Sequence, residues 1–248
     1  MKSDPPQNVI LVTGASGFVG QPLAGALARL APVKGIVRNP GISSSDGVQI
    51  TPVGDYTQVP DWSQVVSGAS VIVHLAARTH VLRDRADDPL AAYRAINVEV
   101  TRKLMEAAAR ANVNRVVLMS SVKAAGEVSG LTPLSESIAP APLDAYGQTK
   151  LEAETLAAEI ARSAGIDLII LRPPMVYGPR VRGNFLRLLR LVDRGIPLPL
   201  ASVRNRRSLV SLDNLIHAVC HAVRHPTRAS GTYFVADPDS TSVPDLIR

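Results

Sequence analysis

The sequence predicts an α/β protein built on a doubly wound parallel sheet, and three observations support that fold class. Short apolar runs rich in Val and Ile alternate with longer amphipathic segments along most of the chain. This pattern is typical of parallel strands that helices cover on both faces. A glycine-rich segment follows the first apolar run directly. With 248 residues, 46% hydrophobic and 19% charged, the chain has the size and composition of a globular protein with a large core.

The order of these segments defines the predicted elements. The expected strands lie at residues 8–14, 33–38, 48–53, 70–76, 114–120 and 166–172. Amphipathic stretches at 18–30, 86–111 and 145–164 are the expected helices. After about residue 175 the alternation weakens, while Pro, Gly and Arg become more frequent. We therefore expect one domain over residues 1–175 and a smaller, loop-rich lobe over 176–248, interleaved with the first.

The first predicted strand leads directly into the segment "TGASGFVG", which precedes a predicted helix. Glycines in this context permit a tight turn and a close approach of the backbone to a pyrophosphate at the positive end of the helix. The segment therefore predicts dinucleotide binding by a Rossmann-like domain. The residues of this segment that we expect at the cofactor are Gly14, Ser16, Gly17, Phe18, Val19 and Gly20.

The end of the second predicted strand indicates which dinucleotide binds. An acidic residue there would accept a hydrogen bond from the ribose 2′-hydroxyl of NAD, whereas a basic residue accommodates the 2′-phosphate of NADP. The sequence has Arg38 at this point and no Asp or Glu before Asp46. This favours NADP over NAD, with an arginine that only faces solvent as the alternative.

A tyrosine and a lysine stand four residues apart in "DAYGQTK", at the start of a predicted helix. Tyr146 and Lys150 would share one face of that helix, and an ammonium beside a phenol lowers a phenol pKa that is normally about 10. Ser120 and Ser121 end a predicted strand, where ligands of open parallel sheets bind. Serine, tyrosine and lysine beside a dinucleotide would form a carbinol–carbonyl site, in which the tyrosine moves the proton.

The segment from 180 to 207 is strongly basic, with eight arginines and a single acid, Asp193. Nucleic-acid sites interleave such charge with stacking aromatic side chains, but Phe185 is the only aromatic residue here. We therefore expect no nucleic acid as a partner and favour a small anionic ligand such as a phosphate ester. A solvated basic face is the alternative.

Other features predict structure rather than chemistry. The histidines at 217, 221 and 225, with Cys220 beside them, lack a second group of ligands, so no metal site is predicted. His74 is expected to be a buried, hydrogen-bonded histidine, and Trp62 a packing residue. A single cysteine cannot form an internal disulfide, and no apolar run approaches eighteen residues. These features favour a cytoplasmic protein without membrane insertion.

The chain resembles the extended short-chain dehydrogenase/reductase family, in its nucleotide-sugar epimerase/dehydratase branch. The matching segments are "VTGASGFVG", "VGDY", "VIVHLAA", "NVEVT", "MSSVKAAGE", "YGQTK", "LRPPMVYGP" and "NRRSLVSLDNL". They span nearly the whole sequence and appear in the order that the family shows. The resemblance implies a nucleotide-sugar substrate, UDP-linked by expectation, and leaves a homodimer open.

The resemblance also implies roles for individual residues. Around the cofactor, Asp55 would contact the adenine, Asn97 would support the helix near the active site, and the residues lining the cofactor would further include Leu75, Ala76, Ala77 and Pro173. The catalytic set would be Ser121, Tyr146 and Lys150, with the last two also at the cofactor. On the substrate side, Ser121 and Lys123 would lie near the sugar, Asn184 near the nucleotide and Arg207 near the diphosphate.

Two departures from the family pattern narrow the expected activity. Sugar dehydratases have Thr-Asp-Glu at the catalytic serine position, where this chain has Ser121, Val122 and Lys123. Many epimerases have Val-Tyr-Gly after the serine, where this chain has "AAG". The form "SSVKAAGE" is most similar to 4-keto reductases of the N-acetylquinovosamine type in surface-polysaccharide synthesis. A nucleotide-sugar 4-epimerase is the alternative, followed by a reductase of a non-sugar carbonyl and a non-catalytic nucleotide-binding protein.

The last residues, "TSVPDLIR", predict the opening of a helix. Ser242 is placed to cap it, Pro244 lies in its first turn, and Asp245 follows the cap by three residues. Because the family's substrate lobe extends further, we expect the lobe to continue beyond this segment.

Overall fold

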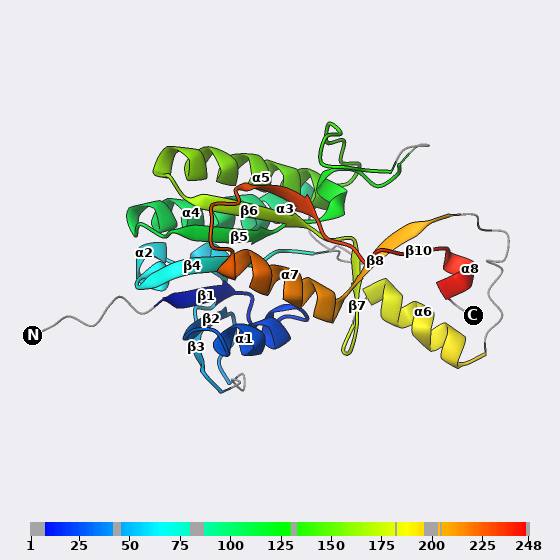
Figure 1. The fold of residues 1–248 in the computed structure, drawn as a ribbon, viewed down its shortest axis with the longest axis horizontal. Helices are drawn as coiled ribbons and strands as arrows, with labels where there is room; N and C mark the ends of the chain where they lie inside the picture. The colour runs from blue at the N-terminus through cyan, green and yellow to red at the C-terminus, as the bar shows by residue number, and fades with distance from the viewer. Residues whose placement is uncertain are drawn as a thin grey trace, which may run out of the picture.

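The computed structural model describes residues 8–41, 46–79, 87–129, 133–181, 183–195, 203 and 205–246. They form a seven-stranded sheet and a smaller three-stranded sheet (Figure 1). The strands of the large sheet lie in the order β3 (Val48–Pro52), β2 (Val33–Val37), β1 (Val9–Thr13), β4 (Ala69–His74), β5 (Arg115–Met119), β6 (Asp167–Arg172) and β9 (Gly231–Phe234). Every neighbouring pair in this sheet is parallel. The predicted fold class and all six predicted strands are confirmed.

Helices cover both faces of the large sheet (Figure 1). One face packs against α2 (Trp62–Val66), α4 (Val100–Arg110) and α5 (Ala145–Ala164). The opposite face packs against α1 (Gly20–Ala28) and α7 (Leu212–Arg224). Successive residues of a strand point to opposite faces, so Leu11 belongs to the first layer while Ile10 and Val12 belong to the second. Burial on both sides explains why the strands are apolar without alternation.

The predicted helix over 86–111 is divided into several segments. An α-helix, α3 (Pro89–Arg94), and the longer α4 flank a π-helical segment, η2 (Ala95–Glu99). Two 3₁₀ turns, η1 (Tyr56–Gln58) and η3 (Val122–Ala124), lie in connections after strands. Trp62, at the start of α2, is 3% exposed and stacks on Tyr56. Its predicted role as a packing residue is confirmed.

Residues after 175 contribute to both sheets. The small sheet has the order β10 (Ser240–Thr241), β8 (Arg207–Ser211) and β7 (Met175–Tyr177), and α6 (Gly183–Asp193) lies between β7 and β8 in the chain. In contrast, β9 pairs with β6 and α7 packs on the large sheet. The predicted C-terminal helix is α8 (Val243–Leu246), and Ser242 Oγ accepts a hydrogen bond from the Asp245 amide at 3.1 Å. No helix within the described ranges has the length and apolar character needed to cross a membrane.

The strand order reverses direction at β1, because β2 and β3 lie on one side of it and β4, β5, β6 and β9 on the other. In doubly wound sheets, ligands bind at this reversal, outside the carboxyl ends of the strands. The reversal thus places the expected ligand site at the ends of β1 and β4.

A buried hydrogen-bonded chain ties these two strands together. His74 is 2% exposed, its Nδ1 lies 2.7 Å from Thr13 Oγ1, and its Nε2 lies 3.0 Å from Thr101 Oγ1 on α4. Because Thr101 donates its hydroxyl proton to Asn97 O, it accepts from His74 Nε2–H. Burial, followed by the charge of Lys150, lowers the pKa of His74 to about 3. The predicted buried, satisfied histidine is confirmed and is neutral at physiological pH.

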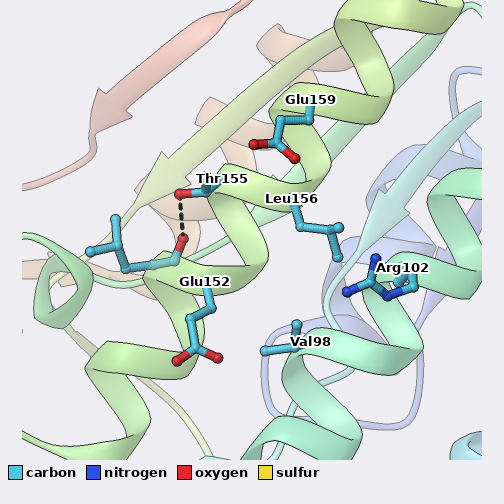
Figure 2. A pocket seen from close by; sticks show the side chains of 7 residues that line it. Val98, Arg102, Glu152, Thr155, Leu156 and Glu159 are labelled. Carbon is cyan, nitrogen blue, oxygen red and sulfur yellow. Dashed lines mark hydrogen bonds between the residues drawn. The ribbon is translucent and has the colours of Figure 1, made fainter.

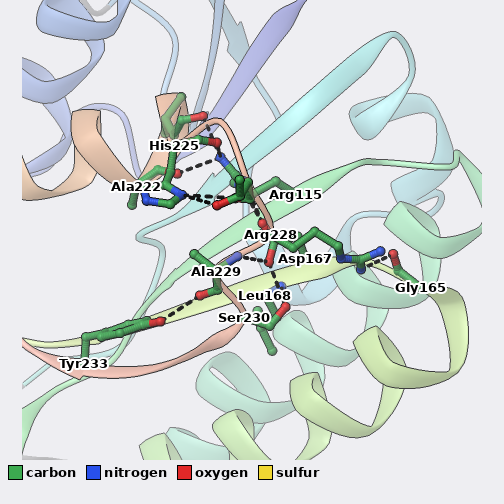
Figure 3. A network of polar contacts seen from close by, with 12 residues as sticks. Arg115, Gly165, Asp167, Leu168, Ala222, His225, Arg228, Ala229, Ser230 and Tyr233 are labelled. Atoms are coloured by element: carbon green, nitrogen blue, oxygen red, sulfur yellow. Dashed lines mark hydrogen bonds and ion pairs between the residues drawn. The ribbon is translucent and has the colours of Figure 1, made fainter.

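Arg115, the first residue of β5, joins the sheet to the end of α7 (Figure 3). Its Nε donates to Asp167 Oδ2 at 2.7 Å, while its Nη1 reaches the carbonyl oxygens of Ala222, Val223 and His225 at 2.8–3.1 Å. These carbonyls belong to the last turn of α7 and to its C-cap residue, where no further helical donors follow. Burial raises the pKa of Asp167, but hydrogen bonds from Ser230, Arg115 and the Ala229 amide outweigh it and lower that pKa.

Replacing Arg115 by methionine should destabilise the protein strongly, since it leaves a buried carboxylate and several helix-end carbonyls without their donor. We expect the free energy of unfolding to fall by about 3–5 kcal/mol in urea denaturation. The matched control is Arg102→Met, which removes an exposed pair with Glu99 whose side chains are 42% and 52% exposed. It should cost about 1 kcal/mol or less. Equal losses for the two variants would contradict the assignment.

The neutral state of His74 predicts a pH dependence of stability. Its ordinary pKa is 6.5 and its folded value is about 3, so below pH 6.5 the unfolded chain binds a proton that the folded protein does not. Stability present above that pH should therefore decline as the pH falls toward 3, by up to about 1.4 kcal/mol per pH unit. His74→Gln should reduce this slope in urea titrations between pH 7.5 and 4.5. His217→Gln, at an exposed position of α7, should leave it unchanged; the same slope in both variants would refute the role of His74.

Candidate active site

The glycine loop after β1 has the close contacts that the sequence predicted. Gly14 has a φ of +68°, and a Cβ there would lie 3.1 Å from the amide nitrogen of Ala76. A Cβ on Gly20 would overlap the carbonyl of Gly14. Glycine is therefore required at both positions for the turn to form against β4 and α1.

The loop leaves the first turn of α1 open. Val19 stands at its N-cap and makes no side-chain hydrogen bond to the helix, and the first turn has no acidic residue. Ser16 and Gly17 are exposed, while Phe18 and Val19 are half-buried. A helix N-terminus of this kind, approached closely by glycine backbone, fits the pyrophosphate of a dinucleotide.

Tyr56 supports the loop and was not predicted. Its hydroxyl accepts from the Gly14 amide at 3.0 Å and donates to Ile36 O at 2.9 Å. It therefore links the glycine loop to β2. The segment "VGDY" contains this tyrosine, but nothing in its local pattern indicates so distant a partner.

Arg38 and Asp55 lie beyond the ends of β2 and β3, where the adenosine half of a dinucleotide is expected. Arg38 is exposed. Asp55 Oδ1 accepts from Thr57 N and Thr57 Oγ1, both at 2.9 Å. The backbone hydrogen bond from Thr57 is the main cause of a lowered Asp55 pKa, and Arg38 contributes a smaller effect. The two predicted residues are therefore close enough to interact electrostatically.

The residues after β4 lie against the glycine loop. The amides of Leu75 and Ala76 donate to Thr13 Oγ1, each at 3.1 Å, and Ala76 is buried against Gly14 while Ala77 is half-buried. Asn97, in the π-helical segment, accepts from the Arg78 amide at 2.8 Å and donates to Thr149 Oγ1 at 3.1 Å. It thereby joins the connection after β4 to the first turns of α5, and π-helical segments are frequent at functional sites.

The start of α5 brings Tyr146 to Ser121. Asp144 caps the helix, with its Oδ1 accepting from the Gly147 amide at 2.7 Å. Ser121 follows β5 and caps η3, and its side chain hydrogen-bonds Tyr146. The Tyr93 ring lies 6.1 Å from that of Tyr146, centroid to centroid. The predicted tyrosine and serine are thus in direct contact, and Ser120 points elsewhere, to Glu154.

The prediction that Lys150 lowers the phenol pKa is wrong for this structure. Burial raises the pKa of Tyr146 to about 12, against a smaller lowering by the hydrogen bond with Ser121. Lys150 instead donates from Nζ to Met119 O at 2.5 Å, at the end of β5. Burial also lowers the pKa of Lys150 to about 8, although Glu154 opposes this change. Tyr146 is therefore a neutral phenol at physiological pH, and Lys150 is a readily titrated amine.

Pro173 and Lys123 make further contacts around η3, the turn that Ser121 caps. Pro173 is buried, and its carbonyl accepts from the Val122 amide at 3.0 Å, which fixes η3 against the end of β6. Lys123 Nζ donates to Asp144 Oδ2 at 2.6 Å and to Glu127 Oε1 at 3.1 Å. Burial would lower the pKa of Lys123, but these carboxylates outweigh it and raise the pKa.

The predicted substrate residues of the C-terminal part belong to β8 and α6. Arg207 is exposed at the start of β8. Asn184 is on α6, but its side chain is outside the described part of the structure, as is Arg204. From the same basic segment, Arg180 donates to Gln21 Oε1 at 2.7 Å, in the first turn of α1. This arginine therefore reaches the helix end that the glycine loop opens, a contact that the sequence did not reveal.

A groove of about 450 Å³ lies between α4 and α5 but is separate from the site (Figure 2). Its lining residues are Val98, Arg102, Leu151, Glu152, Thr155, Leu156 and Glu159. They occupy the side of α5 opposite to Tyr146 and Lys150, and none is among the predicted site residues. Within the described ranges, no group of three or more His, Cys, Asp or Glu side chains is placed to hold a metal ion.

Known proteins match this arrangement. Residues 10–236 match the NAD dependent epimerase/dehydratase family. UDP-glucose 4-epimerase of Vibrio cholerae is 37% identical over 243 residues, which cover 96% of this chain and 74% of that protein. UDP-glucuronic acid 4-epimerase of Bacillus cereus, solved with NAD, superposes with a TM-score of 0.84 at 28% identity, over 96% of this chain and 80% of that one. MoeE5, solved with UDP-glucuronic acid and NAD, gives 0.82 at 30% identity, over 96% and 79%.

The glycine loop, the reversal of strand order and the serine–tyrosine–lysine cluster agree with this match, which spans nearly all of the described residues. The chain belongs to the NAD dependent epimerase/dehydratase family, in its nucleotide-sugar branch.

Proposed function

We propose that this protein is an NAD-dependent 4-epimerase of a UDP-linked sugar. The observation that supports it most is the contact of Tyr146 with Ser121. Lys150 lies one turn further along α5 and bonds Met119 O at the end of β5. This cluster lies at the carboxyl edge of the sheet, on the same edge as the glycine loop. The Vibrio cholerae and Bacillus cereus relatives are 4-epimerases, which makes this activity the first candidate.

In the proposed reaction, the side chains of Ser121 and Tyr146 bind the sugar oxygen and transfer its proton. An oxygen placed beside the Ser121–Tyr146 hydrogen bond would contact both side chains, so Ser121 would orient it. Tyr146 as the phenolate would take the proton when the sugar is oxidised, and the phenol so formed would return it when the keto group is reduced. Bound NAD supplies the hydride acceptor. A cationic Lys150 near the phenol would offset the desolvation that raises the Tyr146 pKa, provided that its ammonium moves from Met119 O toward the tyrosine.

A 4-keto-sugar reductase is the second candidate, and it is the activity that the form "SSVKAAGE" favoured. Lys123 also argues against dehydration, because it stands where dehydratases have a carboxylate and is already paired with Asp144 and Glu127. Reductases consume reduced cofactor each cycle, which would suit NADPH. Exposed Arg38 is the feature that favours NADP, whereas NAD is the cofactor bound in the related structures.

The arginines of residues 180–207, including Arg207, would bind the diphosphate, since guanidinium groups suit phosphate oxygens. We further propose a cytoplasmic enzyme of surface-polysaccharide synthesis, acting as a homodimer. Gel filtration with light scattering tests the oligomeric state directly.

Turnover assays distinguish the two activities. We expect UDP-glucose and UDP-galactose, or their N-acetylated or uronic acid counterparts, to interconvert with NAD present and no net change in nicotinamide absorbance. Chromatography with mass detection and NMR of the products would identify the C4 epimers. Stoichiometric oxidation of NADPH by a UDP-4-keto-6-deoxy-hexosamine, without interconversion of 4-hydroxy epimers, would replace the epimerase by the reductase.

Tyr146→Phe tests the proton carrier. Removal of the hydroxyl should lower kcat at least about 100-fold while NAD binding, followed by fluorescence titration, changes little. Tyr233→Phe is the matched control, because that hydroxyl donates to Ala229 O at an exposed position of β9. Its kcat should equal that of the parent protein. Turnover within a few-fold of normal in Tyr146→Phe would remove this residue from the mechanism.

A further inference from the structure

A second row of contacts lies directly behind the catalytic residues. Tyr146, Lys150 and Glu154 succeed one another every four residues and therefore share one face of α5. Each of them contacts one of three consecutive residues at the end of β5. Lys150 bonds Met119 O, Glu154 bonds Ser120 Oγ, and Tyr146 bonds Ser121. Three residues of this helix face thus bond three consecutive residues at the end of the strand.

Glu154 is held in place by hydrogen bonds from two other elements of the fold. Its carboxylate accepts from Arg172 Nε at 3.0 Å and from Arg172 Nη2 at 2.5 Å, and Ser120 Oγ binds Oε1 as well. The three residues are 4–5% exposed. They come from α5, β6 and β5, so the carboxylate joins three elements where the site is assembled. The Ser120 amide adds a bond to Leu171 O at 2.8 Å, which keeps the two strand ends aligned.

A stabilising role alone does not account for such a pair. Burying a carboxylate and a guanidinium removes both from water, and well-packed apolar residues of similar volume are often as stabilising or more so. What the ion pair adds is a defined geometry, since the planar guanidinium accepts only one orientation of the carboxylate. Here the ion pair fixes the position of Ser120. This serine lies between Met119, which bonds Lys150, and Ser121, which bonds Tyr146.

We propose that Glu154 is a positioning residue of the catalytic site: through Ser120 and Arg172, its carboxylate holds the end of β5 in register with the Tyr146–Lys150 face of α5. The proposal rests on the proposed function for its kinetic consequences only. The bonds described for Glu154 run to Ser120 and Arg172. It acts through the strand end and through its negative charge one turn from Lys150.

The charge of Glu154 gives the proposal a pH signature. Lys150 is coupled electrostatically to Glu154 on the same helix and to His74 on β4. Tyr146 lies one turn earlier on α5, and Arg172 of β6 binds Glu154. His74 and Tyr146 are neutral at pH 7, so Glu154 is the anion that favours the ammonium form. Loss of that anion should lower the pKa of Lys150, which is about 8 in the folded protein.

The test compares Glu154→Gln with Glu152→Gln. Glu152 lies two positions earlier on the same helix and also binds an arginine, Arg94, but on the surface, with side chains 36% and 50% exposed. The charge state of Lys150 is followed by NMR of lysine labelled at Cε, and by its rate of acetylation at each pH. Neither measurement needs substrate, so a wrong assignment of the reaction would not affect them.

In Glu154→Gln we expect the Lys150 titration and the alkaline limb of kcat to move to lower pH together. At pH 7.5 kcat should fall at least about tenfold, with KM for the sugar nucleotide nearly unchanged. Glu154→Asp should recover part of the loss, because it restores the charge. Glu152→Gln should match the parent protein in titration, kcat and KM.

A second variant separates positioning from simple destabilisation. Glu154→Gln leaves Arg172 buried without its partner, whereas Glu154→Gln/Arg172→Met removes both charges and should recover most of the lost melting temperature. We expect the double variant to keep the lowered Lys150 titration and the lowered kcat despite its restored stability. Parent-like titration of Lys150 in both variants, or recovery of kcat in step with melting temperature, would overturn the proposal.

Discussion

Coverage of the parallel sheet on both faces is the constraint on which the rest of this structure depends. Because α2, α4 and α5 pack on one face and α1 and α7 on the other, a polar side chain in the middle of a strand would have no water to reach. Polar chemistry is therefore confined to the strand ends. The glycine loop follows β1, the Thr13–His74 pair closes β1 against β4, and Ser120 and Ser121 follow β5.

Two sets of buried polar groups are joined in chains of hydrogen bonds. His74 bonds hydroxyl groups at both ring nitrogens, and Glu154 binds both Arg172 and Ser120. Such groups are costly unless every hydrogen-bonding atom is satisfied. Each chain also links two or three elements whose relative placement matters for the site. The same hydrogen bonds thus stabilise the fold and place the catalytic residues.

The sequence predicted what depends on local pattern. Six strands follow from apolar runs, the glycine turn from its spacing, and α5 from the amphipathic pattern of residues 145–164. Strand β9 is too short and too mixed in composition to show a period, and its place is set by pairing with β6. Tyr56 and Glu154 act through partners far along the chain, which no local pattern encodes. The direction of the Tyr146 pKa shift was missed for a related reason, since it depends on burial and on the orientation of the Lys150 ammonium toward Met119 O.

The contact of Arg115 with the end of α7 has a consequence for how the chain folds and opens. Its guanidinium bonds carbonyl groups that are 107 to 112 residues later in the sequence. The loop closed by these bonds is long, so the contact forms only after most of the sheet is in place. Conversely, the last turn of α7 and the segment leading to β9 cannot detach without freeing a buried cation at the first residue of β5. The C-terminal part of the described chain and the centre of the sheet should therefore exchange their amide hydrogens as one cooperative unit, rather than as separately opening regions.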